Sequence, residues 1–474
     1  MHKKFFVLIF LLVGNIILPQ PSIYGDPPAR PKYHPVLRFT EDWSVLRDLS
    51  CCQKTDFFDR IKYVPLNCCE TIWASFGGHD RLRVESWHHF NFKPRESSDT
   101  YLLNRLFVHG DFHFGDHFRV FAELKHATST DRDLPGGRRT LDVDIFGFQN
   151  AFADLYFDLG NCVDVTLRGG RQEMLYGKQR LVSPLNWSNT RRTFDGGWLI
   201  AQRKDWTATG FWTKPVRIKK YEANDHFDTG EFFGIYTAGK TPCKETYMDL
   251  YWLGRTRPSA TFNTKTGREE RHTIGMRLWG DLYSDCFTYD IEGAYQFGDL
   301  GSFDIQAYML AVEAVYAFPK FCTEPLIGLG FDYASGDDIN DTSKSKTFSH
   351  LFPLGHAFLG YIDVIGRQNI FDYHAWITCH PMEKMWTTAH FHHFRRASDN
   401  DALYNAGAGV VFGATAGSSK TVGSELDLTC GYSFNPHLKG ELGYCHFFKG
   451  SFVRQAQKDS KSIDFLYSSL LYLF

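Results

Sequence analysis

Positively charged side chains are concentrated in one segment of the sequence, residues 168–197. The segment holds six cationic residues and two acids: Arg168, Arg171, Lys178, Arg180, Arg191, Arg192, Glu173 and Asp195. A guanidinium group is planar and donates two parallel hydrogen bonds, so clustered arginines are suited to binding carboxylate anions. The two acids would hold the guanidinium groups in place and moderate the binding. The opposite interpretation, in which these charges only pair with one another, has equal support from the spacing alone.

Histidines and acids elsewhere do not predict a metal site. His109 and His113 are four residues apart, which on one strand means a separation of about 13 Å, too far to share an ion. The same objection applies in weaker form to His390 and His392, and the acidic stretch 335–341 lacks the ligand spacing of an EF-hand calcium loop. The sequence contains no nucleophile elbow, phosphate loop or HExxH motif. We therefore expect no catalytic residue, no metal and no cofactor.

The composition restricts the class of protein. The chain has 474 residues, of which 43% are hydrophobic, and this is too apolar for a disordered chain. Its 52 basic residues are balanced by 54 acidic ones, so net charge gives no support to nucleic-acid binding. The one long apolar run, residues 5–18, is too short for a transmembrane helix. The aromatic content of 16% is unusually high, and two aromatic girdles around a membrane β-barrel would use it.

The first part of the chain is predicted to be an export signal followed by a periplasmic extension. Residues 1–25 combine a charged start, an apolar core and a small residue, Gly25, at the expected cleavage site. Residues 26–80 are rich in proline at first and show no long two-residue period, so we expect an extension that packs into or under a barrel. The GGHDR motif at residues 77–81 is interpreted as a turn into the first strand. The barrel domain is then expected to span residues 81–474.

The cysteines are unusual for an exported protein because their number, 11, is odd. Cys51 and Cys52 are adjacent, as are Cys68 and Cys69, and these four are expected partners for one or two disulfides ahead of the barrel. The others stand singly, mostly in strand-like sequence. At least one thiol is therefore expected to be free or paired between chains.

From Arg81 onward, apolar and polar residues alternate with the two-residue period of β-strands. In the first of these strands, Leu82 belongs to the apolar face and Arg83 to the polar face. Similar strands follow, and the sequence ends in an aromatic-rich strand, residues 462–474, on Phe474. A soluble sandwich alternates in the same way, but the strand number, the aromatic content and the export signal together favour a transmembrane antiparallel β-barrel. Its length suggests an even number of about 16 to 20 strands.

Residues 168–197 interrupt this alternation. Pro184 and the run at residues 186–189 break strand periodicity, so we expect a loop that folds into a wide barrel, narrows its channel and turns its arginines toward the solute. Arg105 and Arg119 are assigned to the lumen by alternation, and Arg367 from its local context.

Several stretches resemble the alginate export family of bacterial outer-membrane β-barrels. They are GRQEMLYGKQRLVSPLNWSNTRRTFDG at residues 170–196, LRFTEDWSVLRD and DFFDRIKYVPL before the barrel, FDYASGDDIND followed by FSHLFPLGHAFLGYID, and FRRASDNDALYNAG near the end. The resemblance implies an eighteen-stranded barrel in which an anionic polysaccharide passes an Arg-lined, electropositive constriction. The positions that match the motif are Arg171, Arg180, Arg191, Arg192 and Asp195, and Glu173 is their companion acid.

These observations lead to one preferred function and several alternatives. The preferred function is an outer-membrane channel that passes an anionic solute, an acidic polysaccharide such as alginate, through an Arg-lined constriction. The alternatives are a general or small-solute porin, a structural or adhesive barrel with a closed lumen and, with little support, an outer-membrane hydrolase. The expected location is the bacterial outer membrane. The expected partners are outer-membrane lipid, an anionic polysaccharide or oligosaccharide and periplasmic export components, with no nucleic acid.

Overall fold

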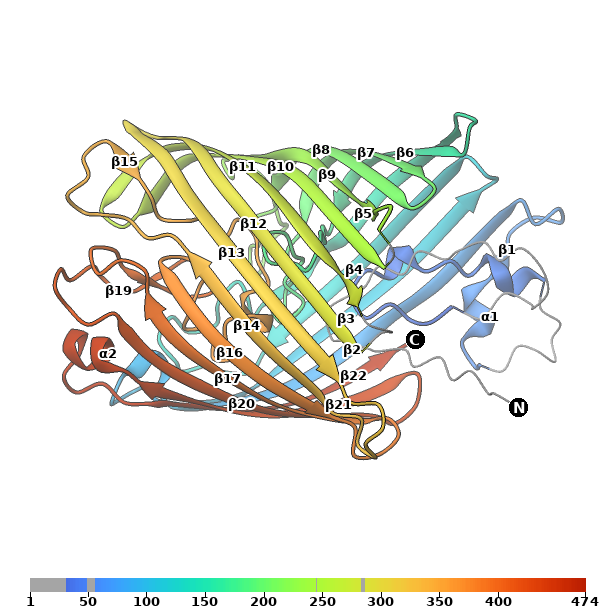
Figure 1. Ribbon diagram of the computed structural model, residues 1–474. Coiled ribbons are helices and arrows are strands. Elements are labelled where there is room, and N and C mark those ends of the chain that lie inside the picture. Colours follow the sequence, from blue (N-terminus) through green and yellow to red (C-terminus); the bar gives the residue numbers. More distant parts are fainter. Residues whose placement is uncertain (1–30, 49–55, 244, 283–285) are drawn as a thin grey trace.

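The computed structural model describes residues 31–48, 56–243, 245–282 and 286–474. The expected export signal, residues 1–25, and the adjacent Cys51 and Cys52 lie outside the described residues. Eighteen antiparallel strands close into a barrel that contains almost no helix (Figure 1). The predicted fold class and strand number are therefore confirmed.

The barrel strands follow one another around the wall in chain order. They are β2 (Ile72–His88), β3 (Asp99–Phe114), β4 (Phe118–Ser129), β5 (Asp144–Asp158), β6 (Val163–Gln172), β7 (Phe194–Arg203), β8 (Trp206–Pro215), β9 (Glu231–Lys240), β10 (Thr246–Phe262), β11 (Lys265–Leu282), β12 (Phe287–Leu300), β13 (Phe303–Ala317), β14 (Leu326–Ala334), β16 (Ile370–Cys379), β17 (Met385–Arg396), β20 (Thr421–Ser433), β21 (Leu438–Lys449) and β22 (Ile463–Leu473). The last strand pairs with the first, for example with Arg83 opposite Ser469. Closure leaves no unpaired strand edge, as a membrane requires.

The remaining elements are short and do not belong to the ring of eighteen long strands, although β1 pairs with β2 and β15 pairs with β13. They are α1 (Asp59–Lys62), α2 (Ser451–Ala456), β1 (Val64–Pro65), β15 (Lys344–Ser345), β18 (Leu403–Tyr404), β19 (Val410–Phe412) and the 3-10 turns η1 (Arg38–Thr40), η2 (Ser44–Arg47), η3 (Phe90–Phe92) and η4 (Gly355–Ala357). No helix among the described residues is long and apolar enough to cross a membrane.

Alternate residues of each strand face opposite sides of the wall. On β2, Leu82 and Val84 are exposed on the outside, whereas Arg81, Arg83 and Glu85 are buried inside. Large apolar and aromatic side chains are exposed along the outer face of most other strands as well. An outer surface of this kind is stable only against hydrocarbon, so the wall faces lipid and the charged side chains face the lumen.

The two ends of the barrel differ in the length of their connections. One end has short turns, such as the two residues between β7 and β8, and the other has long loops, including residues 173–193 and 335–369. The C-terminus and α1 lie at the short-turn end in Figure 1, and β15, β19 and α2 lie at the long-loop end. In bacterial barrels the short turns face the periplasm and the long loops face the outside, which sets the orientation.

The first strand begins earlier than expected. It starts at Ile72 rather than Arg81, so the GGHDR motif at residues 77–81 lies inside β2 and is not a turn. Its glycines serve close packing: a Cβ on Gly77 would lie 2.7 Å from the Phe474 carbonyl oxygen, and one on Gly78 would lie 2.2 Å from the Phe107 oxygen. Because glycine has no side chain, these positions do not show the apolar–polar alternation from which the strand was predicted.

The segment before the barrel packs against the periplasmic end. Tyr33, Trp43 and Tyr63 form a small apolar cluster with Leu473 of β22. Arg38 donates hydrogen bonds to the carbonyl oxygens of Gly78 at 2.5 Å and Phe474 at 3.0 Å. The segment therefore braces the seam where the last strand meets the first.

Nine of the cysteines lie among the described residues, and none forms a disulfide with another described cysteine. Cys68 and Cys69, the expected disulfide partners of Cys51 and Cys52, are exposed. Cys162, Cys243 and Cys322 are also exposed, and each lies in a short turn at the periplasmic end. The exposed thiols of the described residues thus lie on one side of the membrane.

This distribution allows a direct test of orientation. Cells are first treated with a mild reductant so that the cysteine thiols are free to react. A large, membrane-impermeant maleimide should then label Cys162, Cys243 and Cys322 only after the outer membrane is permeabilised. The matched control is Ala416→Cys in the exposed loop between β17 and β20, which should be labelled in intact cells. Labelling of the native turn cysteines in intact cells would reverse the assigned orientation.

Candidate functional site

The loop between β6 and β7, residues 173–193, folds into the barrel and is called here the first inward loop. Its Arg180 side chain is fully buried and donates hydrogen bonds to Asp290 at 2.7 Å and Glu292 at 2.9 Å, both on β12. The other terminal nitrogen of Arg180 reaches Glu313 of β13 at 2.7 Å. Lys178 pairs with the same glutamate. The expected inward fold of this segment is confirmed.

Further along, the same loop reaches the strands on the other side of the lumen. Arg81 and Arg105 donate hydrogen bonds to the Asn186 carbonyl oxygen at 2.9 and 3.0 Å. Arg83 donates to the Trp187 carbonyl oxygen at 2.6 Å, and its guanidinium lies 3.9 Å from the centre of the Trp187 ring. The first inward loop is therefore attached to the wall at both ends of its path across the lumen.

Buried charges on the inner wall differ between the two sides that this loop connects. The strands from β2 to β6 contribute buried charges of both signs. Their cations are Arg81, Arg83, Arg105, Arg119, Lys125 and Arg168, and their acids are Glu85, Asp111, Glu123, Asp144 and Asp154. The strands from β12 to β20 contribute seven buried acids, Asp290, Glu292, Glu313, Asp332, Asp372, Glu425 and Asp427, and one buried arginine, Arg396. Arg83, Arg119 and Arg168 are paired locally, with Glu85 at 2.7 Å and with Asp111 and Asp154 at 2.6 Å. The first inward loop presents cations to the acidic side and backbone carbonyl oxygens to the arginine side.

A second inward loop, residues 335–369, runs between β14 and β16 and packs on the first. Its Phe352 pairs with the first loop: the Ser183 amide donates to the Phe352 oxygen at 2.8 Å, and the Phe352 amide donates to the Leu181 oxygen at 2.9 Å. Its Arg367 pairs with Asp332 of β14. Both loops thus supply cations to the acidic side of the wall.

Apolar side chains fill the space between the two loops. Met174, Leu181 and Val182 of the first loop belong to one buried cluster with Phe348, Leu351, Phe358, Leu359 and Ile362 of the second, and with inward residues of the wall. A close-packed apolar cluster excludes water and gives the loops a fixed arrangement. The middle of the lumen therefore contains a small core, and is not an open water-filled tube.

The segment before the barrel reaches this core from the periplasmic end. Phe39 packs edge-on against Phe121 at 5.9 Å and Phe152 at 5.3 Å, in a cluster that includes Leu175 of the first loop. Arg191 donates a hydrogen bond to the Val36 carbonyl oxygen at 2.9 Å. The first inward loop is therefore held from the periplasmic end as well as by the strands on both sides of the lumen.

Comparison with known proteins identifies the architecture just described. The family model for alginate export matches residues 72–465. The chain belongs to the alginate export family. No curated protein matches the chain by sequence.

Solved structures similar to this family member are porins of outer membranes. The Acinetobacter baumannii OccAB1 structure has a TM-score of 0.57 at 11% identity, covering 85% of this chain and 97% of that one. Pseudomonas aeruginosa OccK5 (OpdH) has a TM-score of 0.56 at 11% identity and coverages of 85% and 98%. Pseudomonas aeruginosa OpdK with vanillate has 0.55 at 10% identity, with 84% and 98% covered. At this identity the likeness concerns the fold, and together with the family it places the protein in the outer membrane as a channel-type barrel.

Most of the arginines singled out in the sequence are paired with acids in this member of the alginate export family. Arg171 pairs with Asp195 at 2.7 Å, and Arg191 pairs with Glu173 at 2.6 Å. Arg119, Arg180 and Arg367 have the carboxylate partners given above. Burial raises the pKa of the Glu173 carboxyl. Pairing among the charges of residues 168–197, one of the two interpretations of the sequence, thus describes Arg171 and Arg191. Arg119, Arg180 and Arg367 pair with acids outside that segment, and contact with a solute stays a prediction.

Two of the predicted arginines have a different environment. Among the described residues, no carboxylate lies within ion-pair distance of Arg105 or Arg192. Arg192 donates a hydrogen bond to the Ser183 carbonyl oxygen at 3.0 Å and lies 5.4 Å from the Phe352 ring centre. Loss of hydration lowers the pKa of its guanidinium to about 10, so Arg192 remains charged at neutral pH. These two side chains keep a positive charge that no acid neutralises.

Sequence reasoning did not select every residue that holds the first inward loop. Arg81 and Arg83 were on the predicted polar face of the first strand, but nothing local showed that they would meet residues a hundred positions later. The acids that bind Arg180 were missed for the same reason, because their place opposite the loop depends on the closed barrel. A polar inward face was the only available signal.

Removal of the Arg180 side chain should loosen the first inward loop strongly. In Arg180→Met, Asp290 keeps Arg277 and Glu313 keeps Lys178, but Glu292 loses its ion-pair partner among the described residues. Breaking such a buried pair costs about 3–5 kcal/mol of unfolding free energy. Urea titration of the protein folded into lipid vesicles measures the loss. The control is Arg217→Met, which removes an exposed pair with Asp225 and should cost less than about 1 kcal/mol. Equal effects of the two variants would contradict the anchoring role.

Proposed function

We propose that this protein is an outer-membrane channel for an anionic solute of the uronate type, an acidic polysaccharide or oligosaccharide such as alginate. The observation that carries the proposal is the environment of Arg81 and Arg105. Both are buried on the lumen side, and both donate to backbone carbonyl oxygens of the first inward loop. No described carboxylate lies within ion-pair distance of either one. Family membership gives independent support.

A carboxylate is a stronger partner for these arginines than a carbonyl oxygen. A carboxylate carries a full negative charge and accepts two parallel N–H bonds from one guanidinium, whereas a backbone carbonyl oxygen offers only a dipole. A solute carboxylate can therefore replace the Asn186 oxygen at Arg81 or Arg105 and displace that part of the first inward loop. The acid-paired arginines, Arg171 and Arg191, would offer weaker contacts along the way because Asp195 and Glu173 already occupy them.

The two ends of the first inward loop resist displacement to different degrees. Lys178 and Arg180 are held by buried carboxylates. Residues 186–188 are held on the arginine side through their neutral carbonyl oxygens, which accept from wall arginines, and through the stacking of Trp187. We infer that residues 186–188 move when solute passes, while the anchor at Arg180 stays in place. Arg192 donates to the carbonyl oxygen of Ser183, a residue between these parts, and would be the next positive group that an incoming carboxylate meets.

A second candidate function is a porin for small carboxylates. The apolar core between the inward loops favours it, because a long polymer needs the loops to move further than a small molecule does. One structural neighbour, OpdK, was solved with vanillate, a small aromatic acid. In this version the same arginines bind one carboxylate at a time, and no polymer enters.

The proposal predicts an anion-selective channel that polyuronate blocks. In planar bilayers with a KCl gradient, the reversal potential of the wild type should show anion preference, and polyuronate should reduce the current. Arg81→Gln with Arg105→Gln removes two charged contacts, each worth at least about 1.5 kcal/mol, so the half-blocking concentration should rise more than tenfold. Glutamine keeps a donor for the loop carbonyl oxygens.

The control and the alternative outcomes separate the candidates. Arg395→Gln removes an exposed charge at the end of β17 and should block like the wild type. Anion-selective current that polyuronate does not affect would support the small-carboxylate porin. Absence of conductance would favour a closed structural barrel, and cation selectivity would overturn both transport proposals.

A further inference from the structure

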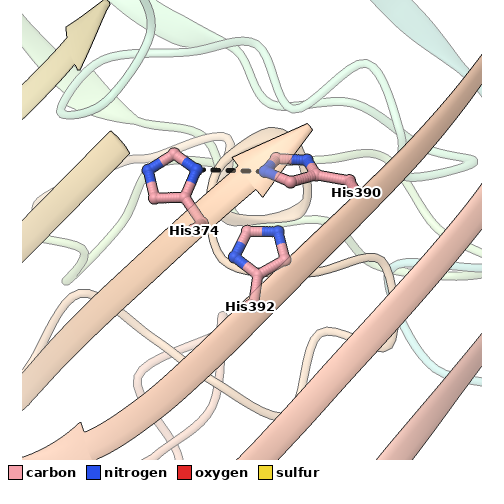
Figure 2. A group of neighbouring side chains, drawn as sticks. All are labelled: His374, His390 and His392. Atoms are coloured by element: carbon pink, nitrogen blue, oxygen red, sulfur yellow. Dashed lines mark hydrogen bonds between the residues drawn. The ribbon is translucent and has the colours of Figure 1, made fainter. Parts of the chain in front are cut away.

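Three histidines meet on the inner face of the wall, beside the contact between Asp332 and Arg367 of the second inward loop. His374 lies on β16, and His390 and His392 lie on β17. The strands pair so that His374 is directly opposite His392 and Trp376 is opposite His390. Each histidine offers one ring nitrogen to a group in which all three nitrogens lie within 4.8 Å of one another (Figure 2).

The spacing of these nitrogens is close to that of ligands on one metal ion. The His374 Nδ1 atom lies 3.0 Å from the His390 Nε2 atom. Two imidazole nitrogens bound to one tetrahedral Zn²⁺ are separated by about 3.3 Å, given Zn–N bonds of about 2.0–2.1 Å. Figure 2 shows the rings of His374 and His390 facing each other with His392 beside them. Small side-chain rotations are enough to direct all three nitrogens at a common point.

Carboxylates behind the histidines set their protonation for this role. The His392 Nδ1 atom lies 2.7 Å from an Asp372 carboxylate oxygen, and the tautomer that donates Nδ1–H to this oxygen leaves Nε2 with a free lone pair for a metal. An acid that receives the second N–H of a ligating imidazole is the usual outer partner in zinc sites. The His374 Nε2 atom lies 3.4 Å from Asp332, which leaves Nδ1 to face His390.

Buried polar atoms around the cluster lack hydrogen-bond partners. His374 and His392 are almost completely buried, and the His374 Nε2, Asp332 Oδ2 and Asp372 Oδ1 atoms form no hydrogen bond with the described residues. Unsatisfied buried groups of this kind need a compensating charge. A dication beside two acids, bound by neutral imidazoles, supplies it.

We propose that His374, His390 and His392 bind one Zn²⁺ ion in the barrel wall. Three nitrogen ligands favour zinc over calcium or magnesium, which prefer oxygen. His390 is only half-buried, so the fourth position of the tetrahedron opens toward the lumen and takes a water molecule. Asp332 is already held by Arg367, which is why it serves as an outer carboxylate and not as a ligand.

The ion would join two neighbouring strands beneath the second inward loop. Asp332 contacts both His374 and Arg367, the cation through which that loop binds the wall. Zinc at the histidines therefore fixes the β16–β17 pair at the place where the loop is anchored. This proposal is independent of the solute that the channel carries.

Zinc binding to the refolded full-length protein tests the proposal. Exposed thiols are first alkylated, and Zn²⁺ is then titrated against a chromophoric chelator. We expect one equivalent to bind, and we expect Co²⁺ to give the visible absorption of a four-coordinate nitrogen site. His374→Gln with His390→Gln should lower the affinity at least 100-fold, and Asp372→Asn should lower it 10- to 100-fold through its effect on His392.

The control is a neighbouring histidine on the opposite face of the same strand. His393 bonds to Ser424, and His393→Gln should bind zinc like the wild type. Each variant is accepted only if its unheated sample migrates on a gel like the folded wild-type barrel. Failure of the wild type to bind one equivalent, equal binding by the His374→Gln/His390→Gln variant, or a cobalt spectrum of thiolate type would each overturn the site.

Discussion

The contact between Arg180 and three carboxylates of β12 and β13 determines the rest of the lumen. Buried acids on neighbouring strands repel one another and lose hydration, so a wall with Asp290, Glu292 and Glu313 on one face is unstable without a cation between them. An arginine that a loop carries into the barrel also loses hydration, and this is unfavourable unless acids bind it. The ion pairs compensate the burial of both the acids and the arginine, and they hold the loop across the lumen. The second inward loop then has a surface to pack on, and its Arg367 repeats the arrangement at Asp332.

From this anchor the structure divides the first inward loop into parts with different tasks. Near Arg180 the contacts are ionic and buried, and an anionic solute has nothing to offer the acids there. At residues 186–188 the contacts are between charged donors and neutral carbonyl oxygens, and these are the contacts that a carboxylate can replace. The apolar core holds Leu181 and Val182 between these two parts, and the Phe39 cluster holds Leu175 on the other side of Arg180. The proposed transport thus depends on a difference between the two kinds of acceptor, the carboxylates at Arg180 and the carbonyl oxygens of residues 186–188. It does not require the whole loop to move.

The sequence predicted whatever is decided by neighbouring residues. Alternation placed Leu82 outside and Arg83 inside because side chains on a strand alternate regardless of what surrounds them. Pro184 marked a break in the strand pattern, and the inward loop follows from it. Contacts set by the pairing of distant strands were out of reach: Arg81 meets Asn186, and His374 meets His390, only after the register of the closed barrel is known. The start of β2 was not predicted because Gly77 and Gly78 have no side chains and so do not show the alternation of a strand. Glycine is needed at these positions because Phe474 and Phe107 approach closely, and this contact also depends on residues far away in the sequence.

The two interpretations of the arginine-rich segment are compatible once its surroundings are considered. A lumen that contains a packed core cannot leave many guanidinium groups without partners, so Arg171, Arg180 and Arg191 must pair with acids if the protein is to fold. Pairing also removes them as strong sites for a solute, which prevents an anion from binding too tightly to leave. In the proposed transport, selectivity would then rest on the few arginines whose partners are backbone oxygens. A neutral acceptor holds such a side chain in place and keeps its charge available, so the same contact that completes the folded lumen is the one an anionic solute can take over.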